Sequence, residues 1–192
     1  MSVLPESHPC TPEVIRLLGS ASRTRFLAEG DRRDLDRAIV LHGELHDLFY
    51  TSENQQHWML SELGDTLRHR FQKYGDEMDL PTALLFLKKG LQVCSVHAPD
   101  RAELFEALAG ALFARYFKLG ELTDLEETVA LQRQALVLRP PGHRDRHLSL
   151  CALGTTLVAL SQQSGDISQL TSAIDYLRDA LSLQDDTVSH RL

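Results

Sequence analysis

The sequence predicts an all-α protein, an α-solenoid of four helix–turn–helix repeats. Four glycines that follow apolar helical stretches are 45 residues apart, at Gly30, Gly75, Gly120 and Gly165. Many other positions keep the same interval in both predicted helices of each unit, and no stretch alternates apolar and polar residues as a strand would. A fixed period of this length indicates a helical repeat array.

Four further series carry the period. They are Leu18, Leu63, Leu108 and Leu153; Leu35, Leu80, Leu125 and Leu170; Asp34, Asp79 and Asp124 with Gln169 in fourth place; and Arg25, Arg70 and Arg115 with Leu160 in fourth place. We expect a repeat domain over 11–192, with units at about 11–55, 56–100, 101–145 and 146–190.

The first unit follows a stretch at 1–10 that has two prolines and little apolar content, which predicts a flexible tail. Residues 11–13 (TPE) combine a hydroxyl, a proline and an acid, as a helix start does. This helix is predicted to reach Glu29, because Gly30 can adopt the left-handed conformation that ends helices. Asp34 is the predicted N-cap of the second helix.

The second unit begins after a polar connector predicted at 51–56. Gly75 ends its first helix, and Asp79 is the predicted cap of its second helix. Pro81 then falls in the first helical turn, where a missing N–H costs little.

In the third unit, Asp100-x-x-Glu103 and Asp124-x-x-Glu127 resemble capping boxes at two helix starts. The pair Tyr116-Phe117 is predicted to face the core. Two prolines at 140–141 end the unit.

The fourth unit is predicted to hold helices at about 146–164 and 169–183. Terminal repeats normally present a polar outer face, and the last predicted helix has none. The sequence leaves three alternatives: an exposed apolar face, a longer array, or self-association through this repeat.

The arginines Arg25, Arg70 and Arg115 could form a ladder for an acidic ligand. We favour a structural role, in which each stem packs over the core and each head pairs with an acid or caps a helix end.

Composition and sequence patterns argue against several classes of protein. The net charge of −7 argues against nucleic acid as a partner, since phosphate binding needs clustered Lys and Arg. No apolar run approaches the length of a membrane helix, and no secretory signal is present. Three widely spaced cysteines, Cys10, Cys94 and Cys151, indicate reduced thiols. We therefore expect a cytoplasmic protein.

The second helices resemble the tetratricopeptide repeat, with Ala173 and Ala180 seven residues apart, Thr128 and Ala135 at the same places, and Pro140 five residues later. Leu-Gly pairs at 18, 63 and 153 match the first helices. The usual unit has 34 residues, so this is a long variant, similar to arrays of basidiomycete fungal proteins that often precede a CHAT domain, a caspase-like peptidase module. The resemblance implies a right-handed superhelix.

The resemblance also implies a binding surface, the concave face lined by first helices. Its positions fall here on Arg16, Ser20, Arg23, Ser61, Asp65, Arg68, His69, Glu106 and Phe113. The expected function is a non-enzymatic scaffold for a peptide or protein partner. The alternative is a regulatory or sensor segment of a larger effector that carries a CHAT domain outside this chain.

Catalytic and metal-binding patterns are weak. We identify no set of nucleophile, base and orienting residue, no phosphate loop and no cofactor motif. His42 and His46 share a helix face, as some metal ligands do, but no further ligands recur at suitable spacing. We expect no enzyme activity, no cofactor and no metal, and keep a metal-binding protein using these histidines as a third alternative.

Overall fold

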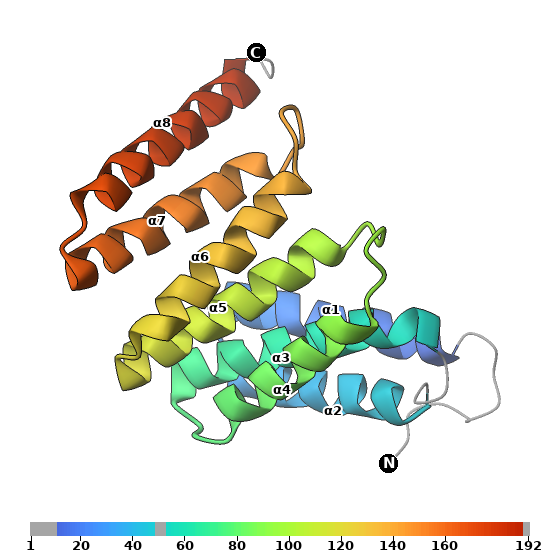
Figure 1. Ribbon diagram of the computed structural model, residues 1–192. Coiled ribbons are helices and arrows are strands. Elements are labelled where there is room, and N and C mark those ends of the chain that lie inside the picture. The colour runs from blue at the N-terminus through green and yellow to red at the C-terminus, as the bar shows by residue number, and fades with distance from the viewer. Residues whose placement is uncertain (1–10, 49–52, 190–192) are drawn as a thin grey trace. The chain divides into compact units, whose positions relative to one another are not determined.

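The computed structural model describes residues 11–48 and 53–189. Within these ranges every regular element is an α-helix, and none is a strand. The helices, drawn in Figure 1, are α1 (Thr11–Glu29), α2 (Arg32–Leu48), α3 (Glu53–Tyr74), α4 (Asp79–Val93), α5 (Arg101–Leu119), α6 (Leu122–Val137), α7 (Arg146–Ser164) and α8 (Ile167–Ser189). The predicted all-α helical repeat is confirmed. The predicted tail at 1–10 lies outside the described residues.

Successive helices form antiparallel hairpins, as the α7–α8 pair in Figure 1 shows. The first helices end at Glu29, Tyr74, Leu119 and Ser164, each 45 residues after the last. The following glycine has a φ of 74° to 79° in every case. Its N–H donates to the carbonyl four residues earlier, as from Gly120 to Tyr116 at 2.7 Å. The predicted glycine turns are therefore confirmed.

Gly120→Ala should lower the free energy of unfolding by about 1 kcal/mol, because alanine at positive φ is strained. The added Cβ would meet no atom within 4 Å, so the loss would come from the backbone alone. Gly43→Ala is the matched control, since Gly43 lies inside α2 with equally open space. That change should stabilise the protein by up to about 1 kcal/mol. Urea denaturation of both variants measures the contrast, and a loss of the same size in both would contradict it.

The chain divides into two compact units, Met1–Val96 and His97–Leu192, each of which holds two hairpins. In the first unit, Ile39 of α2 packs against a cluster formed by Leu63, Leu67 and Ala83. In the second unit, α6, α7 and α8 share one cluster. Its buried members are Leu125, Val129, Leu153, Leu157, Leu160 and Ala173.

The recurring Leu-Gly pair has a packing reason. A Cβ at Gly64 would lie 2.6 Å from Cγ of Leu87, and one at Gly154 would lie 2.6 Å from Cγ of Leu177. Leu177 follows Leu87 by two repeat periods. Glycine at this position therefore lets the two helices of a hairpin approach closely.

In the first and third hairpins a polar residue stands at the position that Leu87 and Leu177 occupy in the second and fourth. His42 is equivalent to Leu87, is fully buried, and lies against Gly19. Gln132 is the third member and is also buried. Both His42 nitrogens and Oε1 of Gln132 lack a hydrogen-bond partner among the described residues.

The periodic aspartates do not cap the second helices, so this prediction is wrong. Asp34 and Asp124 lie inside the first turns of α2 and α6, and Asp79 begins α4. Each carboxylate is buried and instead pairs with the arginine nine residues earlier. The prediction that each arginine head pairs with an acid is thereby confirmed. An acid in the first turn also suits the positive end of the helix dipole.

Both partners change together in the fourth hairpin. Leu160 occupies the arginine position and is buried in the α6–α7–α8 cluster, while Gln169 occupies the aspartate position. An unpaired aspartate at that place would leave a buried charge without compensation. In the fourth hairpin the ion pair is thus replaced by a leucine and a neutral glutamine, which leaves no charge at either position.

Four smaller predictions are corrected. Asp100 precedes α5 but its side chain makes no capping hydrogen bond. Helix α3 begins at Glu53, inside the predicted connector, and α8 extends beyond its predicted range at both ends. Phe117 was predicted to face the core, yet 72% of it is exposed. Neighbouring helical residues differ by about 100° in direction, so Tyr116 and Phe117 cannot both face inward.

Candidate interaction surface

A charged cluster joins α1 and α3 in the first unit. It consists of Arg23, Glu62, Asp65, Arg68 and His69. The Asp65 carboxylate accepts from Nη1 of Arg23 at 2.7 Å and from Nη2 of Arg68 at 2.6 Å. The structure thus brings together four residues predicted for partner binding. The charges of Arg23, Asp65 and Arg68 largely neutralise one another within the cluster.

Two cluster atoms keep unused capacity. Nε of Arg23 and Oε2 of Glu62 are buried without a hydrogen-bond partner in the described part of the chain. Burial raises the pKa of Glu62, and Arg23 offsets part of this effect. Burial would also raise the pKa of Asp65, but Arg68, His69 and Arg23 outweigh it and hold that pKa below its usual value. Because both atoms are buried, the unmet donor and acceptor lie inside the cluster and not on its surface.

Arg16, another residue predicted for partner binding, lies over the ring of Trp58 in the first unit. Its guanidinium lies 5.4 Å from the ring centre of Trp58 and also pairs with Glu13. Ser20 and Ser61 lie on the same two helices, α1 and α3, and both are half-buried.

Glu106 lies in a buried polar network of the second unit. Ser149 Oγ donates to Glu106 Oε1 at 2.7 Å and accepts from Nη1 of Arg139 at 2.7 Å. Burial raises the pKa of Glu106, and the Ser149 hydrogen bond and Arg139 oppose the rise. The network connects α5, the end of α6 and α7. Glu106 is thus tied to the packing of these helices.

An aromatic ridge occupies the last turns of α5. We define it as Phe113, Tyr116 and Phe117. Phe117 contacts Phe113 edge-on at 5.0 Å and Tyr116 at 5.4 Å between ring centres. Phe113 and Tyr116 are half-buried against the α6–α7–α8 cluster, which fixes the ridge while Phe117 projects into solvent.

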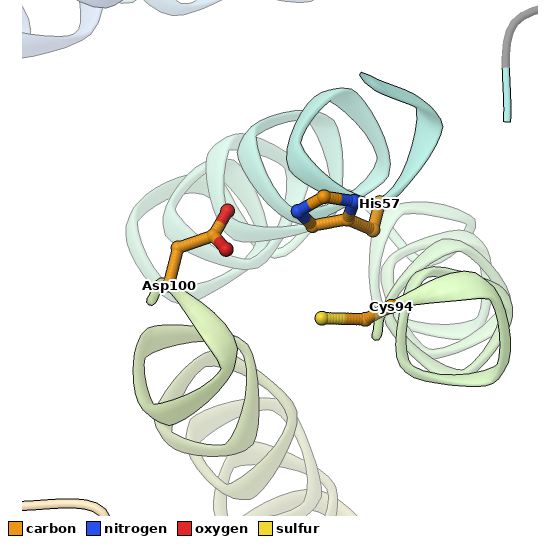
Figure 2. A group of neighbouring side chains, drawn as sticks. All are labelled: His57, Cys94 and Asp100. Carbon is orange, nitrogen blue, oxygen red and sulfur yellow. The ribbon is translucent and has the colours of Figure 1, made fainter. Parts of the chain in front are cut away.

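The third alternative, a metal-binding protein, rests on His42 and His46. His42 is enclosed by Gly19 and by the Trp58 ring at 6.3 Å. The side chain of His46 lies outside the described residues. A different pair, His57 of α3 and Cys94 at the end of α4, lies close together in the first unit, with ligand atoms within 4.8 Å (Figure 2). Two ligands are fewer than a structural metal site uses. Asp100, also drawn there, belongs to the second unit.

Sequence reasoning missed Glu62, Arg139 and Ser149. Arg139 is equivalent to Cys94 in the previous repeat, so the 45-residue period carries no signal for it. Its partners are also ten or more residues away along the chain. Only the folded contacts reveal the network.

Comparison with known proteins supports the fold. No family model matches the chain, and no curated protein matches it. Among solved structures, it is similar to one described as "DHF58 filament", with a TM-score of 0.54 at 16% identity over 96% of this chain and 98% of the other. It is also similar to a de novo designed helical repeat protein, DHR64, with a TM-score of 0.43 at 17% identity over 94% and 96%.

None of the helices in the described residues is long and apolar enough to cross a bilayer.

Proposed function

We propose that this chain is a non-enzymatic, cytoplasmic helical-repeat scaffold that binds a peptide or protein partner on its first helices. The aromatic ridge of α5 carries the proposal. Its exposed Phe117 is held by contacts to Phe113 and Tyr116, so binding it would cost little side-chain ordering. Aromatic anchors of this kind supply most of the affinity in many interfaces.

Two further features support the proposal. The side chains of Arg23, Arg68 and His69 in the charged cluster on α1 and α3 remain 16% to 24% exposed, so a partner can reach part of the cluster. The tetratricopeptide resemblance assigns the binding surface to first helices, and the ridge and the cluster both lie on first helices. The four alanine and threonine positions of that resemblance, Ala173, Ala180, Thr128 and Ala135, are buried as close helix packing requires.

Arginine substitutions would test the partner surface poorly. Replacing Arg23 or Arg68 would also break the internal pairs with Asp65. A loss of binding could then reflect a disturbed α1–α3 contact. Phe117 is the better site, because its ring is mostly exposed.

A photo-crosslinking amino acid at position 117 should capture the partner from extracts of the native source. The matched control carries the same group at Val137. This residue is more exposed than Phe117 but lies on α6, the second helix of its hairpin. The purified partner should then bind Phe117→Ala about tenfold or more weakly than wild type, a loss of about 1.4 kcal/mol. Val137→Ala should bind like wild type. Equal capture at both positions, or unchanged binding by Phe117→Ala, would refute the proposed surface.

A further inference from the structure

Helix α8 carries an exposed apolar stripe in the second unit. We define the α8 stripe as Ile167, Leu170, Ile174 and Leu181, all of which are at least 38% exposed. At about 100° per residue, their spacing puts them within roughly 60° of arc on one helix side. Apolar side chains grouped in this way usually mark an interaction site.

Earlier repeats show what covers the same positions. Leu125 and Val129 of α6 are equivalent to Leu170 and Ile174, and are 0% and 6% exposed against 38% and 42%. They pack on α7, through Leu153 and Leu157 among others. Ile39 of α2 packs on α3 in the same way. The natural occupant of this face is therefore a first helix of the same repeat type.

Helix α1 is such a first helix, and its matching side is open. Val14 is 36% exposed, whereas its equivalents Met59 in α3 and Ser149 in α7 are 2% and 0% exposed. Ala21 is exposed, while Thr156, its equivalent in α7, is buried. We define the α1 face as Val14, Leu18, Ala21 and Arg25, which succeed one another at helical spacing.

We propose that the α8 stripe of one molecule docks on the α1 face of a second copy, in a head-to-tail contact that repeats the α6–α7 and α2–α3 packing within the chain. The two surfaces differ, so one contact leaves a free α1 face and a free α8 stripe at the ends of the pair. Heterologous contacts of this kind extend into rings or filaments.

This contact is separate from the proposed partner surface. Arg16, Ser20 and Arg23 lie on the side of α1 opposite to the α1 face, by the helical angle of about 100° per residue. The aromatic ridge lies on α5. Self-assembly and partner binding can therefore fail independently, and Phe117→Ala should assemble like wild type.

Sedimentation of the purified chain over a concentration series tests the proposal. Wild type should show masses that rise with concentration in multiples of 21.6 kDa. Two variants each block one surface: Leu170→Lys/Ile174→Lys on α8, and Val14→Lys/Ala21→Lys on α1. Each should stay monomeric alone. The charge-matched control Val40→Lys/Val137→Lys changes two exposed apolar residues elsewhere and should assemble like wild type.

Mixing the two blocked variants gives the decisive result. Each keeps one intact surface, so the mixture should form a one-to-one dimer and nothing larger, which also shows that both variants are folded. A wild-type chain that stays monomeric at all concentrations would overturn the proposal. Self-association of the α1-blocked variant alone would overturn it too, since that outcome means pairing of two α8 stripes.

Discussion

Arg115→Leu should lower the free energy of unfolding by about 3 kcal/mol. We expect no larger loss from replacing any other partly exposed side chain. Arg115 donates to both Asp124 oxygens, at 2.5 and 2.9 Å, and Asp124 is buried. Removing the arginine leaves a buried carboxylate with no opposite charge. Losses of this size are typical when one partner of a buried pair is removed.

Adding Asp124→Gln should restore most of that loss. The double variant recreates the Leu160 and Gln169 combination of the fourth hairpin. We expect it to be within about 1 kcal/mol of wild type, which corresponds to a coupling energy of at least about 2 kcal/mol, increased by whatever Asp124→Gln costs alone. Asp124→Gln alone should cost less than Arg115→Leu alone, because the one-third exposed arginine can reach water.

Urea denaturation of the three variants completes this cycle. Arg133→Leu is the control, since it removes an exposed arginine of the same charge from α6. It should change stability by no more than about 0.5 kcal/mol. A double variant no more stable than Arg115→Leu would show that the two pairs are not interchangeable.

Acid should destabilise the protein through His42, by about 2 kcal/mol between about pH 7 and pH 5. Burial, with a smaller contribution from Arg23, lowers the pKa of His42 to about 4. The unfolded chain takes up this proton near pH 6.5. Because the unfolded state binds more protons between about pH 6.5 and 4, the stability contributed by neutral His42 is full above this window and is lost as pH falls through it.

His42→Leu should remove this pH dependence. The substitution copies Leu87 and Leu177, which pack beside the equivalent glycines Gly64 and Gly154. Leucine also removes two buried nitrogens that have no hydrogen-bond partner in the described structure. The measurement is the difference in unfolding free energy between wild type and variant at pH 7 and pH 5, in which the effects of other groups cancel. His143→Leu, at an exposed site, should leave the pH dependence unchanged. A variant that remains as acid-sensitive as wild type would contradict the role of His42.

The helices and their turns were predictable because local chemistry repeats. A glycine that must adopt positive φ leaves a mark at a fixed interval, and the four turn glycines gave both the period and the helix ends. The pairing of the periodic aspartates with arginines was harder to predict from the sequence. Their position near helix starts favoured capping. The fourth unit nevertheless loses the arginine and the aspartate together, as Leu160 and Gln169, which indicates that the two residues are partners.

The contacts within the candidate interaction surface were only partly predictable. The resemblance to tetratricopeptide repeats placed Phe113 and the charged residues on first helices, but could not show that Asp65 would bind two arginines. The network of Arg139, Glu106 and Ser149 joins residues that share no period. Such contacts depend on how hairpins stack, and local sequence patterns do not encode them.

The central claim is that each 45-residue period folds as one helical hairpin. Backbone NMR chemical shifts of the 192-residue chain test it most directly, because they report helix and turn for each residue. We predict helical shifts through α1 to α8, with breaks at Gly30, Gly75, Gly120 and Gly165 that share the same left-handed signature. Breaks that depart from this interval, or extended shifts inside any of the eight segments, would contradict the account.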